Sequence, residues 1–462
     1  MSLRVATAGL ELMEEALRAQ GLDPAAVDWK PPAGGRVDDL DLLTRAYSEE
    51  RIERANAAAL AALADARPVL VGAGAAADRI PEMTRERLIL HAGPPIDAAD
   101  MCAPQRIAAA AACVLEGWAA DTAAATELLL RGEVALASAH SFGAAGAMTG
   151  IISPSMAVWE TRDEESGAVS YSPFCDGPGA AFWLGVGSDE AIARQRLLAD
   201  VVAPAFDAAL AADGSLEVFP LLAEAIAMGD DCHMRHQAAT MLLLRRTLGA
   251  MADRAPGAVA DVGRLLADNG HFALTVTISA CRVALERMRG TDNSSLVTFI
   301  SRNGVDAAIE LAGLPGQWFR GPAEMVGDAL YRPGLGDQDA APDIGDSALI
   351  ECCGLGAAAS AASPSVAAFL GGSLADAIER TRYMGDITLT ESETFRITTL
   401  DGEGTPLGVD ARAVLDLGQT PLINTGILHR VDGGQIGAGV AAAPLDPFRQ
   451  ALRHLLEGPA VT

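Results

Sequence analysis

The spacing of apolar residues predicts helices near the start of the chain and throughout its middle. Residues 49–65, EERIERANAAALAALAD, place apolar side chains on one face of a helix. From Ser188 to about Gly290 similar segments are separated by Gly, Asp or Pro, which predicts about five helices. Between these regions, the Ala-rich stretch Ile107–Leu130 predicts a further helix.

Short apolar runs predict strands on either side of the helical region. Pro68–Val71 is followed by Gly72 and Gly74, so we expect a strand, a tight turn and a helix. Gly72-x-Gly74-x-x-Ala77 fits the Ala-ended form of the dinucleotide fingerprint. The second run, Leu88–Leu90, ends without an acidic residue to hold a ribose, so we favour a Rossmann-like scaffold over NAD binding. Further strands are expected at 178–187, Thr394–Thr398 and Leu422–Leu428.

These patterns predict an α/β (α+β) multidomain protein. The expected parts are a Rossmann-like N-terminal unit at 1–100, an α/β domain at 101–190, a helical domain at 191–290 and a mixed α/β domain at 291–462. Much of the candidate site falls in the last domain.

The charge and composition of the chain limit the kinds of molecule that it is expected to bind. The chain of 462 residues has 34 basic and 61 acidic residues, a formal charge of −27. A field of this sign repels nucleic acid and anionic membranes, and a small anionic substrate needs a local pocket of Arg or His. The seven cysteines are scattered and the N-terminus lacks a secretory signal, so we expect a cytoplasmic protein. Two uncharged stretches, Val134–Trp159 and Cys352–Ala375, are too poor in Leu, Ile and Phe for membrane insertion and are expected to be buried.

Polar residues concentrate in segments 229–238, 291–306, 342–365 and 424–444, each set in apolar sequence. Polar groups in such surroundings are usually buried and need specific partners. We therefore expect the four segments to converge on one pocket.

The segment 229–238, GDDCHMRHQA, has three interpretations. His233 and His236 could share one helix face and bind a metal with Cys232 or Asp230. Alternatively, Gly229–Asp231 could cap a helix that continues through Leu244. In the third interpretation His233 and Arg235 bind or protonate an oxyanion in a cleft. No third ligand follows at a spacing typical of zinc sites, so we expect a metal-free helix start that also lines a pocket.

The other three segments contribute further candidates. Arg302 and Asn303 end a β-rich run before Gly304, where they could face a site or form an ordinary turn. Glu351 is expected to follow a short apolar strand, and the small-residue helix start after it could bind an anion or simply pack closely. Asn424 ends a predicted strand. No nucleophile elbow, P-loop or kinase motif occurs, which leaves Asp and Arg acting with His on a small molecule.

Taken together, the sequence resembles the YlbE-like proteins, a family encoded beside FdrA. The resemblance rests on LHAGPPI at 90–96, GDDCHMR at 229–235, DNSSLVT and SRNGVD within 292–306, WFRGPA at 318–323, PDIGDSA at 342–348 and QIGAG at 435–439. It implies α/β pieces around an orthogonal helical domain. It also implies a subunit of oxamate carbamoyltransferase in allantoin breakdown, with an FdrA-like protein and a third subunit as partners. The implied reaction converts oxalurate and phosphate to oxamate and carbamoyl phosphate. We expect no cofactor, and a homo-oligomer is compatible with the sequence.

Carbamoyl transfer passes through a tetrahedral oxyanion that needs fixed donors. From the residues alone we expect His233, Arg302 and Asp231 to be catalytic. The expected substrate-binding residues are Arg235, Asn293, Asn303, Asp306, Asp346, Glu351 and Asn424. Two other functions remain open: a non-catalytic partner of an FdrA-like relative of acyl-CoA synthetases, and a stand-alone amide or ring-opening hydrolase.

Overall fold

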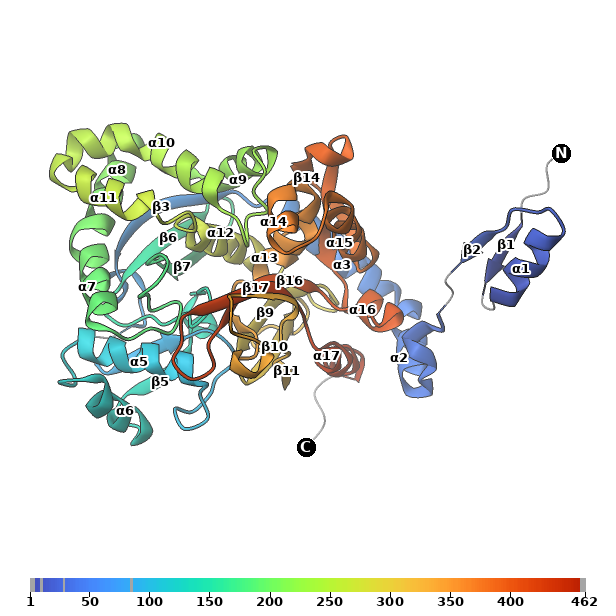
Figure 1. The fold of residues 1–462 in the computed structure, drawn as a ribbon, viewed down its shortest axis with the longest axis horizontal. Helices are drawn as coiled ribbons and strands as arrows, with labels where there is room; N and C mark the ends of the chain where they lie inside the picture. The colour runs from blue at the N-terminus through green and yellow to red at the C-terminus, as the bar shows by residue number, and fades with distance from the viewer. Residues whose placement is uncertain (1–4, 9–10, 28–29, 84–85, 458–462) are drawn as a thin grey trace.

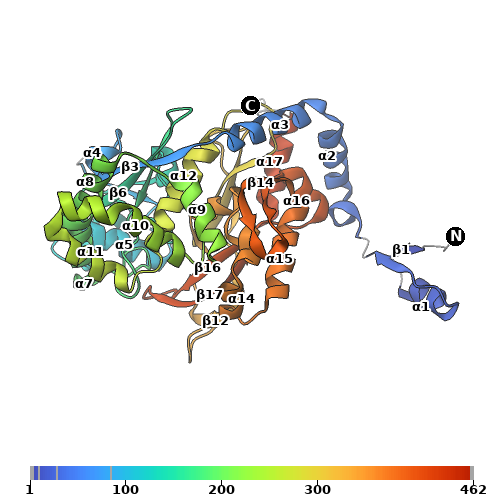
Figure 2. The ribbon, with the colours of Figure 1, turned by 90° about the horizontal axis from the view of Figure 1, so that it is seen from above.

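The computed structural model describes the chain except residues 1–4, 9–10, 28–29, 84–85 and 458–462. Near the N-terminus, β1 (Ala6–Ala8) pairs in parallel with β2 (Ala25–Val27) and flanks α1 (Glu11–Ala19). This unit lies apart from the rest of the protein in two perpendicular views (Figures 1 and 2). It is followed by α2 (Val37–Ser48) and α3 (Glu50–Ala64), and α3 confirms the helix expected at 49–65.

The first large sheet is antiparallel. Its strand order is β7 (Val169–Pro173), β6 (Ala157–Asp163), β3 (Pro68–Ala75), β8 (Leu216–Glu217). The next strand along the chain, β4 (Leu88–His91), instead pairs in parallel with β5 (Ala135–Ser138) in a separate sheet. The expected Rossmann-like unit at the start of the chain is therefore wrong, because β3 and β4 do not share a sheet.

Gly72 and Gly74 serve a different purpose from phosphate binding. Both lie inside β3, where an added Cβ would come within 2.7 Å of Asp207 Oδ1 or Arg79 Nε, respectively. Arg79 follows the strand in α4 (Ala76–Arg79), and its Nη2 contacts Asp207 Oδ1 at 2.7 Å. The glycines thus leave room for an ion pair that packs against the strand.

The helical region agrees with the expectation from periodicity. It comprises α7 (Asp189–Leu197), a π-helical turn (Leu198–Val202), α8 (Ala203–Asp213), α9 (Val218–Ala227), α10 (Gln237–Arg254), α11 (Val259–Ala267) and α12 (Leu274–Glu286). All residues of α12 but the last are buried. This helix packs on β6 and β7 and also contacts β9, so it joins the helical half to the C-terminal half (Figure 2).

Two local predictions are corrected. The stretch Ile107–Leu130 contains two helices, α5 (Ala103–Leu115) and α6 (Thr122–Leu130), because Asp121 caps the second through the N–H of Ala124. Residues 178–187 form turns rather than a strand. There, Asp176 Oδ2 accepts the Phe182 N–H at 2.6 Å and holds the backbone in a compact loop.

The C-terminal half contains three small sheets. One has the order β11 (Phe319–Pro322), β10 (Asp306–Leu311), β9 (Val297–Asn303), β13 (Ile344–Gly345). The second has the order β12 (Gly327–Tyr331), β17 (Gln435–Ala442), β16 (Leu422–Leu428), and the third pairs β14 (Thr388–Ile397) with β15 (Glu403–Val409). The helices are α13 (Leu349–Cys352), α14 (Pro364–Phe369), α15 (Leu374–Asp386), α16 (Ala411–Leu417) and α17 (Asp446–Glu457). The strands expected at Thr394–Thr398 and Leu422–Leu428 correspond to the end of β14 and to β16.

The α+β multidomain class is confirmed by this mixture of helices and small sheets. The domain boundaries stay predictions, and the pairing of β3 with both β6 and β8 crosses those at 100 and 190. Within the described residues, no helix is both long and apolar enough to cross a membrane.

Candidate functional site

The segment 229–236 is a buried loop between α9 and α10. The helix expected from Gly229 is wrong, because α10 begins at Gln237. Asp230 still supports that helix start, since its Oδ2 accepts the Ala239 N–H at 2.8 Å. Burial raises the pKa of Asp230 to about 6, although bonds to helix N–H groups and Arg235 oppose the shift.

His233 and Glu351 form a buried pair at the centre of the candidate site. His233 Nδ1 lies 2.6 Å from Glu351 Oε1, and the two side chains are 4% and 0% exposed. Burial raises the pKa of the Glu351 carboxyl, and the nearby His233 and Arg302 oppose this shift. Glu351 belongs to α13 rather than following a strand, so the sequence expectation for its local structure is wrong. The contact with Glu351 fixes the orientation of the imidazole ring. The other ring nitrogen, Nε2, forms no hydrogen bond with the described residues.

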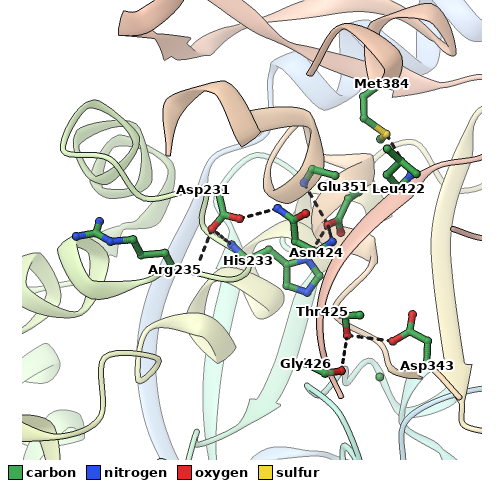
Figure 3. Close-up of polar contacts among 12 residues, drawn as sticks. Asp231, His233, Arg235, Asp343, Glu351, Met384, Leu422, Asn424, Thr425 and Gly426 are labelled. Carbon is green, nitrogen blue, oxygen red and sulfur yellow. Dashed lines mark hydrogen bonds and ion pairs between the residues drawn. The ribbon is translucent and has the colours of Figure 1, made fainter. Parts of the chain in front are cut away.

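Asp231 and Asn424 hold the loop against β16. Asn424 Nδ2 donates to Asp231 Oδ2 at 2.8 Å, and the Asn424 N–H donates to Glu351 Oε1 at 3.3 Å. Asp231 Oδ1 accepts the N–H groups of His233 and Arg235 at 3.2 and 2.8 Å. Figure 3 shows Asp231, His233, Glu351 and Asn424 as one connected group, drawn from a loop, a helix and a strand. Asn424 lies inside β16 rather than at its end.

A small cavity adjoins this group. It has a volume of about 30 Å³ and is lined by His233, Asn424 and Thr425, together with Ala147, Met148, Trp183, Leu184, Met234, His271, Leu274, Ser347, Gly426 and Gln435. This volume holds about one or two water molecules. A ureido acid is larger, so its binding here requires the lining side chains to move.

Arg302 lies beside the group but is fully engaged. Its Nε and Nη2 donate to Asp343 Oδ2 and Oδ1 at 2.7 and 3.1 Å, and its Nη1 donates to the Gly345 carbonyl. Thr425 donates its hydroxyl to Asp343 Oδ1 at 3.0 Å, which connects the ion pair to the neighbour of Asn424 (Figure 3). Arg302 is only 2% exposed. The structure therefore gives its guanidinium a partner in Asp343.

Four other expected site residues have bonds away from the cavity. Arg235 pairs with Asp230, and in Figure 3 its guanidinium points away from His233. Asp346 accepts the N–H groups of Gly93 and Gly146 and the Ser301 hydroxyl. Asn303 Oδ1 accepts the N–H groups of Val305 and Asp306 in the turn at Gly304, and its Nδ2 donates to the Pro94 carbonyl. Asp306 begins β10 and lies 4.0 Å from Arg320 in a partly exposed pair.

Asn293 occupies a turn with φ of 68°, a left-handed conformation that Asn tolerates well. The structure thus brings together Asp231, His233, Glu351 and Asn424. Arg302 is linked to this group through Asp343 and Thr425. The remaining expected site residues do not line the cavity beside His233.

His271 lines the cavity just before α12 and was not predicted from the sequence. Its Nε2 contacts the Met234 carbonyl at 2.8 Å, and burial lowers its pKa. His236 was singled out as a possible metal ligand but is fully buried, and burial lowers its pKa well below the ordinary value. The described residues contain no group of three or more His, Cys, Asp or Glu side chains placed to hold a metal ion. The scarcity of histidine, seven in the whole chain, was the one signal that could have drawn attention to His271.

Comparison with known proteins shows which family the chain resembles. The sequence model of the family described as oxamate carbamoyltransferase subunit AllG matches residues 134–347. The chain is 35% identical over 411 residues to the oxamate carbamoyltransferase subunit AllG of Escherichia coli strain K12, covering 88% of this chain and 98% of that protein. It is 33% identical over 456 residues to the uncharacterized protein YahG of the same organism, covering 97% of this chain and 96% of that protein.

A solved structure shares the fold. The crystal structure of a conserved protein of unknown function from Enterococcus faecalis V583 matches with a TM-score of 0.85 and 33% sequence identity. The match covers 88% of this chain and 98% of that chain. Sequence and structure agree over nearly the whole length of these relatives, and the chain therefore belongs to the AllG family.

Proposed function

We propose that this chain is a subunit of an oxamate carbamoyltransferase that works with an FdrA-like protein and a third subunit. The proposed reaction transfers the carbamoyl group of oxalurate to phosphate, in the cytoplasm and within allantoin breakdown. Similarity to the AllG subunit supports membership of such a complex. The observation that carries the chemistry is the buried His233–Glu351 pair beside a cavity.

His233 is suited to proton transfer in this reaction. A phosphate oxygen attacks the ureido carbonyl carbon of oxalurate, and His233 Nε2 accepts the proton of the attacking phosphate hydroxyl. The tetrahedral intermediate then breaks its bond to the amide nitrogen, which receives that proton from His233 and leaves as oxamate. The carbamoyl group remains on phosphate. Glu351 holds Nδ1 as the donor and stabilises the imidazolium formed between the two steps.

The charges around the cavity indicate that the anions are held by groups from elsewhere. Oxalurate and phosphate are both anionic, yet the residues that line the cavity include no Lys or Arg. The nearest guanidinium, that of Arg302, is paired with Asp343. Additional cations would have to come from a partner, which supports a subunit over a stand-alone hydrolase.

The same observation favours a second candidate function. If both anions bind on a partner, this chain could shape a shared site without handling protons. In that case the His233–Glu351 pair would only stabilise the fold.

Reconstitution with the two proposed partner subunits tests both functions. The assay follows carbamoyl phosphate formed from oxalurate and phosphate. With His233→Gln we expect turnover to fall by about 10²–10⁴-fold, the usual contribution of general acid–base catalysis. His454→Gln in α17 is the control for a histidine replaced elsewhere in the fold, and circular dichroism verifies folding.

Wild-type turnover by His233→Gln in the full mixture would refute the acid–base role and favour the non-catalytic subunit. Turnover of oxalurate by this chain without phosphate or partners would indicate the hydrolase instead.

A further inference from the structure

A second and much larger cavity lies away from His233, where α3, the start of α9 and the β14–β15 hairpin meet. Its volume is about 560 Å³, within the range of sites that bind small molecules or side chains of a partner. Contacts between α9 and β14 form one side, and both elements lie next to each other in Figure 1. The candidate site does not use this cavity.

The floor of the cavity is apolar. Phe219 and Phe395 meet edge to face with ring centroids 5.2 Å apart, and Leu60 and Leu407 also line the space. An apolar hollow of this kind on a surface marks a place where another molecule can bury its own apolar groups.

A bulge in β14 builds the rim. Glu391 pairs with Pro406 and Arg396 with Gly404, so β14 contains extra residues between these two pairs. The Ser392 hydroxyl accepts the N–H groups of Thr394 and Phe395 at 3.2 and 3.0 Å. The bulge is therefore an ordered part of the wall.

The rim is acidic. Glu217, Glu391 and Glu393 line the cavity and are exposed, and none forms an ion pair with a residue that the structure describes. Among the residues that line the cavity, the one cationic side chain is Arg67. It donates from Nη1 to the carbonyl of Ala64, the last residue of α3, and to that of Ala66 just beyond it. Glu391 Oε2 accepts the Gly404 N–H at 3.3 Å, but within the described part of the chain no cation pairs with any of the three carboxylates. Carboxylates around an apolar floor favour an occupant that is apolar and positively charged.

The cavity also reaches the helix that carries Glu351. Cys353 lines the cavity and directly follows α13, whose third residue is Glu351. An occupant would therefore contact the chain two residues from the partner of His233.

We propose that this cavity is the docking site for a segment of a partner subunit. A large aliphatic or aromatic side chain of the partner enters the cavity, and a neighbouring Lys or Arg pairs with the rim glutamates. This inference rests on the proposed function as a subunit, and it adds where and by what chemistry the partner is bound.

Charge argues against two other possible occupants of the cavity, the helix α1 of this chain and a second copy of the chain. The N-terminal helix α1 exposes its Leu12 and Met13, but it contributes Glu11, Glu14 and Glu15 against a single basic residue. A second copy carries a net charge of −27. Each would bring carboxylates to an acidic rim, which is repulsive.

The test measures binding of the purified FdrA-like protein and of the third subunit to the full chain by isothermal titration calorimetry. Ala61→Trp fills the cavity from an exposed position on α3, and Ala58→Trp adds the same side chain to an exposed position of α3 that does not line it. For one of the two partners, we expect Ala61→Trp to weaken binding at least about tenfold, and Ala58→Trp to bind as wild type.

Charge is tested separately. Glu217→Lys combined with Glu393→Lys should weaken binding at low salt, and the difference from wild type should shrink at high salt. Glu86→Lys combined with Asp268→Lys makes the same change in net charge at exposed positions that do not line the cavity, and it should leave the affinity near that of wild type.

The binding results distinguish failure of the docking site from failure of the subunit proposal. Wild-type affinity in both cavity variants would refute the docking site while leaving the subunit proposal intact. Failure of the wild-type chain to bind either protein would refute the subunit proposal and the docking site with it. A change in self-association of the cavity variants, measured by analytical ultracentrifugation, would assign the cavity to a second copy instead.

Discussion

Replacing Arg302 by Met should destabilise the fold rather than only remove activity. The guanidinium is 2% exposed and donates to both oxygens of Asp343 and to the Gly345 carbonyl. Met keeps most of the side-chain volume but leaves the Asp343 carboxylate buried without its cation. Among the described residues, the Thr425 hydroxyl and the Ile344 N–H, at 3.0 and 2.9 Å, would be the donors left to it.

The expected magnitude follows from the geometry of the pair. Breaking a buried, doubly bonded ion pair by removing one partner costs about 3–5 kcal/mol of unfolding free energy. Asp343→Leu should cost a similar amount, because it leaves the guanidinium buried with one carbonyl acceptor. The double variant leaves no unpaired buried charge, so its cost should fall below the sum of the two single costs by at least about 2 kcal/mol.

Urea denaturation followed by circular dichroism measures these differences in a double-mutant cycle. Arg54→Met is the control, because Arg54 and its partner Glu50 are 74% and 90% exposed, and such pairs contribute little. An Arg302→Met variant that unfolds at the wild-type urea concentration but no longer supports carbamoyl transfer would refute the structural role. It would restore the catalytic role expected from the sequence.

Two further predictions concern the site and the pH dependence of stability. Gly356 has φ of 62° and an added Cβ would collide with Glu351 Oε1, so Gly356→Ala should displace Glu351 from His233 and lower carbamoyl transfer in the reconstituted assay. The control is Gly371→Ala, because Gly371 has φ of 78° and open space around it. This change should lower the free energy of unfolding by about 1–2 kcal/mol without changing turnover. Equal turnover by the Gly356→Ala and Gly371→Ala variants would contradict the role of the His233–Glu351 contact. The second prediction concerns Asp176, whose pKa burial raises from 3.8 to about 6. The folded chain therefore keeps this proton to a higher pH than the unfolded chain. The protonated carboxyl stabilises the fold fully below the unfolded pKa, and this stabilisation is lost as the pH rises through 6. The urea midpoint should therefore fall less between about pH 4 and pH 6.5 in Asp176→Asn than in wild type, and parallel pH profiles would show that Asp176 is ionised throughout.

Local periodicity predicted what depends on local sequence. The helices from 188 to 290 and the strand β16 could be predicted because their buried apolar residues follow the regular spacing of a helix or a strand. The prediction of a Rossmann-like unit was wrong because tertiary packing, which local sequence does not show, explains the two glycines. Gly72 and Gly74 resemble a phosphate-binding turn, yet they are required by the side chains of Arg79 and Asp207, which pack on the strand from other elements.

The candidate site was predicted in its members but not in its connections. Asp231, His233, Glu351 and Asn424 were each singled out because polar residues within apolar sequence need buried partners. Their pairings could not be predicted, since Asn424 and Asp231 are 193 positions apart and His233 and Glu351 are 118 apart. Nothing in the sequence around Arg302 shows that Asp343 already occupies its guanidinium, so a structural ion pair and a substrate-binding arginine have the same appearance there.

The balance of buried charge connects the site to the proposed complex. The buried carboxylates of Asp231, Glu351 and Asp343 lie near His233, and the guanidinium of Arg302 beside them is paired with Asp343. Such a group of carboxylates repels a second anion. A chain that supplied the whole active site for oxalurate and phosphate would need free cations at the cavity, and the residues that line it provide none. The arrangement is consistent with a protein that supplies the proton-transfer group while a partner supplies the positive charge, so the partner should bring basic residues to the His233 cavity as well as to the acidic rim near α3.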